Sequence, residues 1–151
     1  MKHFVQLLCA LTLMLASQVQ AGPAEEVAEI AGPRLRALVQ GDVDGYTAAY
    51  ADNAVLSSSL SAFRIEGKEA IRAYYVELFQ NYPRRRVLQR QPLVRVYNED
   101  LVVQNSYSVL YLTDSKGQAL VYHVRSSVTW SKINNRWQVV DQHTSRLPVA
   151  Q

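Results

Sequence analysis

The stretch RWQVVDQHTS, residues 136–145, combines the pattern of a β-strand with two side chains that can perform acid–base chemistry, Asp141 and His143. Successive side chains of a strand face opposite ways, so these two residues share one face. A carboxylate beside an imidazole can orient the ring and tune its pKa, which suits proton transfer. The same pattern also fits the polar outer face of a sheet, and the spacing leaves both interpretations open.

Strict alternation along this strand puts Trp137 and Val139 on the same face as Asp141 and His143. The preceding strand adds His123 and Arg125, which leads to four hypotheses. The first is an isomerase- or dehydratase-like enzyme in which Asp141 and His143 are catalytic. The second is a polar surface for self-association or a structural ion pair, in which Asp141 pairs with Arg125 across the strands. The third is a ligand-binding role for this face. The fourth is a metal site, because two histidines and a carboxylate are a recognised ligand set. No short fixed spacing supports it, so we expect neither a metal nor a cofactor.

The opposite face of the same strands carries hydroxyl and amide groups, and the helices that precede them are rich in aromatic residues. Such a lining suits a small neutral ligand held by shape and hydrogen bonds, and it contains no nucleophile paired with a base. Alternation alone does not say which face lies inside. The candidate pocket residues of this set are Tyr46, Tyr50, Tyr75, Phe79, Ser106, Ser108, Ser126, Gln142 and Thr144.

The elements that must position these side chains follow from hydrophobic periodicity. Apolar residues at helical spacing predict a helix over 24–40, a second helix that carries Tyr46 and Tyr50, and a third over 68–81. Period-two alternation predicts the strands. Helices followed by closely connected strands predict an α+β domain, with helices on one face of a curved antiparallel sheet. The expected strands are 54–56, 62–65, 86–97, 101–113, 119–132 and 136–146.

The first residues have the layout of a secretory signal peptide. Lys2 and His3 precede an apolar run from Phe4 to Ala16, and the stretch 19–21 offers small residues before a cut after Ala21. The apolar run is too short for a membrane span of about 20 residues, so we expect no transmembrane segment. The prediction is therefore a signal peptide over residues 1–21, one domain over 22–151, and a periplasmic or secreted mature protein.

Composition narrows the function further. The single cysteine, Cys9, lies in the predicted signal peptide, so the mature chain has neither disulfides nor a thiol nucleophile. Nine tyrosines, two tryptophans and three phenylalanines supply much of the core. The net charge of +3 is too small to indicate a nucleic-acid partner, and we expect none.

Three stretches together resemble a known family. They are GDVDGYTAAYADNAVL (41–56), IEGKEAIRAYYVELF (65–79) and the closing strand RWQVVDQHTS. Their order is similar to that of the NTF2-like, or SnoaL-like, cone fold. Within that fold they most resemble the calcium/calmodulin-dependent kinase II association domain and its bacterial stand-alone relatives. The resemblance spans residues 24–147, and the chain has no kinase segment.

The resemblance implies a deep pocket between helices and sheet, and a homodimer or larger homo-oligomer built through the sheet. It adds Ile71 and Val128 to the pocket residues and places the face with Ser108 and Thr144 inside. The eukaryotic relatives line this pocket with arginines that hold small carboxylates. The matching positions here are Ser108, Val128 and Thr144, none of which is charged. The leading hypothesis is an exported small-molecule-binding or oligomerisation module whose ligand the sequence does not name, with the Asp141/His143 enzyme as the alternative.

Overall fold

The computed structural model describes residues 21–148. The predicted signal peptide lies outside the described residues except for Ala21. Three helices and six strands follow in chain order: α1 (Pro23–Gln40), α2 (Val43–Thr47), β1 (Tyr50–Ser57), β2 (Ile65–Glu66), α3 (Lys68–Asn81), β3 (Arg84–Asn98), β4 (Leu101–Thr113), β5 (Ala119–Ile133) and β6 (Arg136–Arg146). Among these residues no helix is long and apolar enough to cross a bilayer.

The strands form one curved sheet in the order β2-β1-β6-β5-β4-β3. The four long strands pair antiparallel with their neighbours, as predicted. The sheet is mixed where an antiparallel one was predicted, because β1, the strand next to the β2 edge, runs parallel to β6. Parallel pairing needs a long connection, and the whole chain between the two strands provides it.

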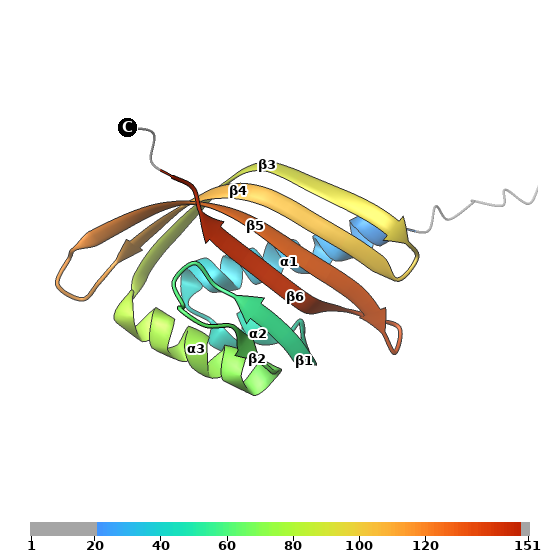
Figure 1. Ribbon diagram of the computed structural model, residues 1–151, viewed down its shortest axis with the longest axis horizontal. Coiled ribbons are helices and arrows are strands. Elements are labelled where there is room, and N and C mark those ends of the chain that lie inside the picture. Colours follow the sequence, from blue (N-terminus) through green and yellow to red (C-terminus); the bar gives the residue numbers. More distant parts are fainter. Residues whose placement is uncertain (1–20, 149–151) are drawn as a thin grey trace, which may run out of the picture.

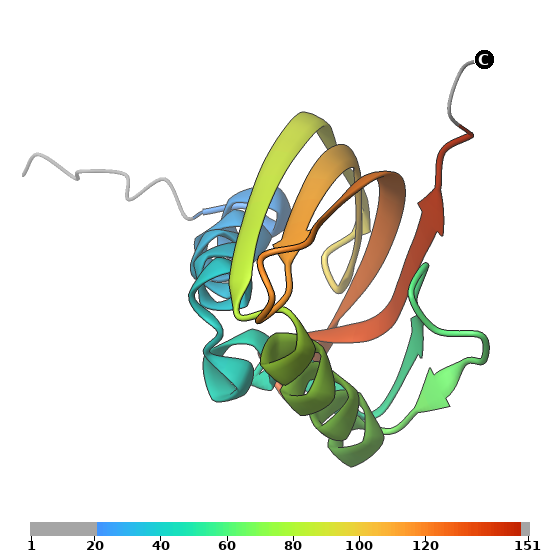
Figure 2. The same cartoon turned by 90° about the vertical axis from the view of Figure 1, so that its left-hand side faces the viewer.

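α1 and α3 pack against the concave face of the sheet, and α2 packs against both of these helices (Figure 1). Seen along the molecule, the sheet curls over them and the helices close the open side (Figure 2). The core between the layers includes the fully buried side chains of Trp130, Tyr50, Leu56 and Ile71. Burial of large apolar surface of this kind is the main stabilising contribution to such a fold.

A turn between α1 and α2 directs the chain toward the core. Gly41 ends α1 in the left-handed region, with φ at 82°, and its amide donates to the Ala37 carbonyl. Glycine adopts this conformation without a Cβ penalty. The Asp42 side chain then caps α2 by accepting from the Gly45 amide at 2.9 Å. Tyr46 is thereby held at the edge of the core, one short turn after α1 ends.

A β-bulge in β6 changes which side chains face inward. Thr129 lies opposite Asp141 and Trp130 lies opposite Val139, which leaves Val140 as the extra residue. Trp137 and Val139 are buried, whereas Asp141 is exposed. The prediction that these residues share one face is therefore wrong, because strict alternation does not survive an inserted residue.

Candidate functional site

A cavity of about 340 Å³ lies between the helices and the concave face of the sheet. Its walls combine leucines and valines from α1, α3, β4 and β5 with hydroxyl and amide groups from the sheet. The size is at the small end of the range found for ligand sites in proteins. A small organic molecule of mixed polarity fits such a lining.

Most of the predicted pocket residues line this cavity. They are Tyr46, Tyr75, Ser106, Ser108, Ser126, Val128, Gln142 and Thr144. Three others, Tyr50, Ile71 and Phe79, are buried in the core instead. These three side chains pack among other core residues and do not reach the cavity wall.

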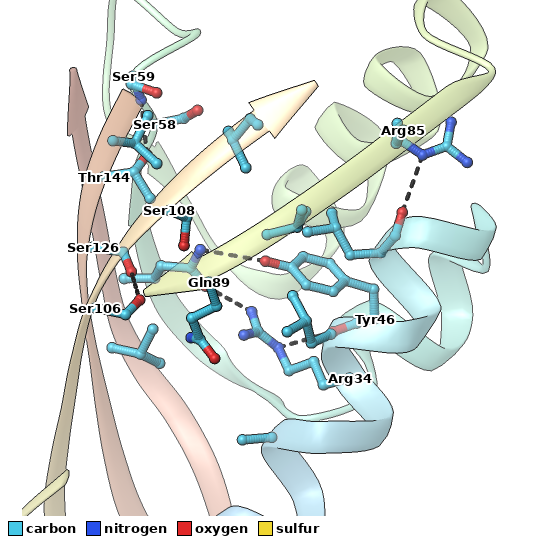
Figure 3. A pocket seen from close by; sticks show the side chains of 18 of the residues that line it. Arg34, Tyr46, Ser58, Ser59, Arg85, Gln89, Ser106, Ser108, Ser126 and Thr144 are labelled. Atoms are coloured by element: carbon cyan, nitrogen blue, oxygen red, sulfur yellow. Dashed lines mark hydrogen bonds between the residues drawn. The ribbon is translucent and has the colours of Figure 1, made fainter. Parts of the chain in front are cut away.

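The serines and Thr144 make the sheet side of the cavity polar. Ser106 and Ser126 face each other on β4 and β5, with their hydroxyl oxygens 2.9 Å apart. The hydroxyl of Thr144 accepts from the amide of Ser59, which fastens the loop after β1 to β6. Figure 3 shows these groups on the wall that faces the helices.

Asp141 and His143 lie outside the cavity. Both side chains are exposed on the convex face of β6, opposite Thr129 and Ser127 of β5. The expected partner of Asp141, Arg125, lies opposite Ser145 and donates to its hydroxyl at 3.0 Å. Across residues 21–148 no three His, Cys, Asp or Glu side chains gather closely enough to hold a metal ion.

The sequence interpretation missed Arg34, the charged group at the centre of the site. Its side chain extends from α1 into the cavity wall and is only 9% exposed (Figure 3). Nε donates to the Tyr46 carbonyl at 3.2 Å, and Nη2 donates to Oε1 of Gln142 at 2.6 Å. A sequence signal existed, because position 34 falls seven residues after Val27 on the apolar stripe of α1. A charge within such a stripe indicates a buried role.

Aromatic rings surround the guanidinium of Arg34. Its central carbon lies 4.1 Å from the ring centre of Tyr46 and 4.8 Å from that of Tyr50. Trp130 follows at 5.9 Å. These cation–π contacts partly compensate for lost hydration, but they supply no negative charge.

Gln142 connects Arg34 to three tyrosines. Its Oε1 accepts from Arg34 and, at 2.7 Å, from the Tyr50 hydroxyl, while its Nε2 donates to the Tyr46 hydroxyl at 3.3 Å. Tyr75 also donates to the Tyr46 hydroxyl, at 3.3 Å. The amide oxygen must face Arg34, because an arginine can only donate. This network holds Arg34 and Tyr46 in fixed positions.

The tyrosines respond differently to this environment. Burial by itself raises the pKa of Tyr46, but the charge of Arg34 and the two accepted hydrogen bonds outweigh burial and hold that pKa below its usual range. Burial, followed by the proximity of Tyr46, raises the pKa values of Tyr50 and Tyr75. Tyr46 is therefore the most acidic hydroxyl of this buried group.

Arg85 also lines the cavity, and two of its three guanidinium nitrogens donate to carbonyls within the protein. Nε donates to the Leu38 carbonyl at 3.0 Å, and Nη1 donates to the carbonyls of Phe79 and Tyr82. These carbonyls belong to the last turns of α1 and α3, where a cation also offsets the helix dipoles. Burial lowers the pKa of Arg85. We assign it a structural role at the junction of the two helices.

Helices packed on the concave face of a curved sheet, with a cavity between the layers, define the NTF2-like class of α+β cones. The sequence match is more specific. Residues 23–148 match the calcium/calmodulin dependent protein kinase II association domain, and the chain belongs to this family.

Solved structures agree with the fold. A candidate association domain from Xanthomonas campestris is similar at 23% identity over 87% of this chain and 95% of its own, with a TM-score of 0.73. An NTF2-like protein of unknown function from Pseudomonas putida is similar at 20% identity over 81% and 84%, with a TM-score of 0.69. A candidate dehydratase of the NTF2-like family from Streptomyces avermitilis is similar at 12% identity over 83% and 97%, with a TM-score of 0.73. No curated protein matches the sequence.

Proposed function

We propose that this protein is an exported, non-catalytic module that binds a small molecule in the cavity between helices and sheet. The observation that carries the proposal is the cavity itself, in which apolar walls surround a few converging polar groups. Of the residues described, those lining it include no Asp, Glu, His or Cys. Binding by shape and hydrogen bonding therefore suits the lining better than acid–base catalysis by a carboxylate or imidazole.

Two adjacent serines of β5 allow a matched test of this proposal. Ser126 lines the cavity, whereas Ser127 lies on the convex face opposite His143. A Ser126→Phe substitution fills the cavity, and Ser127→Phe adds the same ring outside it. Binding of 3-phenylpropionate and 3-phenylpropanamide is measured by calorimetry for the wild type and both variants. We expect binding to be lost in Ser126→Phe alone. Equal binding by all three proteins, or no binding to the wild type, would contradict the proposal.

The alternative is the isomerase- or dehydratase-like enzyme that uses Asp141 and His143. The dehydratase candidate among the similar structures is the observation that favours it. Against it, the exposed positions of both side chains leave no enclosed site that would exclude water around them. Turnover of a candidate substrate that depends on these two residues would revive this function.

Self-association through the convex face is the second part of the proposal. Tyr107, Tyr111 and Val121 are 45%, 37% and 50% exposed there, and Tyr111 lies directly opposite Val121. Contiguous apolar side chains on a surface are typical of a protein interface. We expect a dimer in analytical ultracentrifugation and a monomer for Tyr111→Lys. A monomeric wild type at micromolar concentration would overturn this part.

Export rests on the predicted signal peptide. We expect the N-terminus of the mature protein, recovered from the cell envelope or medium, to begin at residue 22. A mature protein that still begins at Met1 would contradict export.

A further inference from the structure

Arg34 carries a buried charge that no acid within residues 21–148 neutralises. The ion pairs found there join Arg64 to Glu66, Arg72 to Asp44 and Lys132 to Glu26. Arg34 contacts neutral groups instead: a carbonyl, an amide oxygen and aromatic rings. An arginine stays protonated in proteins, and an unpaired buried charge is costly. An ionisable side chain buried in a cleft without an ion-pair partner is a candidate for a functional site.

Arg34 and Tyr46 each keep a donor for which no hydrogen-bond partner is found among residues 21–148. Nε and Nη2 of Arg34 are engaged, and Nη1 has no hydrogen-bond partner in the described part of the chain. The Tyr46 hydroxyl accepts two hydrogen bonds, and no acceptor for its own proton is found there. Both side chains line the cavity. A guanidinium and a hydroxyl that line the same cavity are donors suited to the two oxygens of a carboxylate.

The other residues that line the cavity indicate the chemistry of the rest of the ligand. Leu35, Leu110, Val124 and Val128 supply apolar lining, and the hydroxyls of Ser106 and Ser126 lie on the sheet wall (Figure 3). The second arginine of the lining, Arg85, already donates through Nε and Nη1 to carbonyls at the C-terminal ends of α1 and α3, so Arg34 is the better candidate for an anion. The lining thus favours an apolar group with a single anionic end.

Resting on the binding function proposed above, we propose that the ligand is a small organic monoanion, a carboxylate on an apolar body, whose carboxylate is bound by Arg34 and Tyr46. This site is on the helix side of the cavity. It differs from the sheet positions Ser108, Val128 and Thr144, where the eukaryotic relatives are expected to place their arginines. No charged residue stands at those sheet positions in this chain, whereas Arg34 of α1 lines the cavity.

Two pairs of probes, each an acid and its amide of similar shape, test whether binding depends on the charge of the ligand. The pairs are 3-phenylpropionate with 3-phenylpropanamide and hexanoate with hexanamide, each measured by calorimetry near neutral pH. We expect each carboxylate to bind the wild type roughly ten- to a hundredfold more tightly than its amide, the range for hydrogen bonds to a charged group. In Arg34→Gln this preference should disappear. Arg36→Gln is the control, because Arg36 is an exposed arginine on the same helix.

The outcomes separate this inference from the binding function. Equal affinity for acid and amide, or a preference that persists in Arg34→Gln, would overturn the anion site while the cavity remains a binding site. No binding of any probe to the wild type would overturn both. If Arg34→Gln does not fold, Arg34→Lys and Tyr46→Phe replace it. Each should weaken carboxylate binding several-fold and leave amide binding unchanged, and unchanged carboxylate binding in both would overturn the inference.

Discussion

The two faces of β6 carry polar side chains in opposite circumstances. On the concave face, Gln142 is 6% exposed, and both ends of its amide bond to Arg34 and the tyrosines. On the convex face, Asp141 and His143 point away from the cavity. A buried polar group must be satisfied or it destabilises the fold, whereas an exposed one exchanges its partner for water. Asp141 and His143, whose side chains suggested acid–base chemistry, thus lie where the fold depends little on their polar groups.

The largest difference between the faces should appear in packing. Leu56 of β1 lies beside Gln142 and is fully buried, whereas its neighbour Val55 lies beside Asp141 and is half-buried. We expect Leu56→Ala to lower the free energy of unfolding by about 2–5 kcal/mol, through lost burial and the cavity left behind. Val55→Ala should cost much less. Chemical denaturation measures both, and equal losses would contradict the assignment of the faces.

A smaller difference is expected for polar groups. Gln142→Leu leaves Nη2 of Arg34 and the Tyr50 hydroxyl without their acceptor, so we expect a loss of about 1–3 kcal/mol. His143→Leu, on the adjacent position, should change stability by less than about 0.5 kcal/mol. Thermal and chemical unfolding check this pair. A loss at His143 as large as that at Gln142 would show that the outer side chain has an unrecognised partner.

The buried tyrosines predict a pH effect on the concave side. The pKa of Tyr75 is raised in the folded protein, first by burial and then by Tyr46, so the unfolded chain loses this proton first as pH rises. Stability is therefore fully present below pH 10 and declines above it. Tyr75→Phe should make that decline shallower. Denaturation midpoints between pH 9 and 11 test this, and identical slopes for both proteins would contradict it.

The smallest effect is expected for substitutions of Asp141 and His143 on the convex face. Asp141→Asn combined with His143→Gln should leave the affinity for 3-phenylpropionate within about twofold of the wild type, because neither side chain lines the cavity. Calorimetry measures the affinity, and circular dichroism verifies the fold. A tenfold loss of affinity would place the binding site on the convex face.

Much of the fold could be predicted because periodicity is a local property. The third helix was predicted over 68–81 and is observed from Lys68 to Asn81. The bulge at Val140 could not be predicted, since it depends on how β6 pairs with β5. Arg34 could not be placed in this way, because hydrophobic periodicity identifies the buried face of a helix by its apolar residues and not by a charged residue among them. The charged residue within the apolar stripe of α1 is the one that lines the cavity.

The most direct test of the cavity as the binding site is a crystal structure of the protein with 3-phenylpropionate. We expect the ligand between the helices and the concave face, with its carboxylate against Arg34 and Tyr46 and its ring among Leu110, Val124 and Val128. Ligand bound on the convex face beside Asp141 and His143, with the cavity unchanged, would contradict the account.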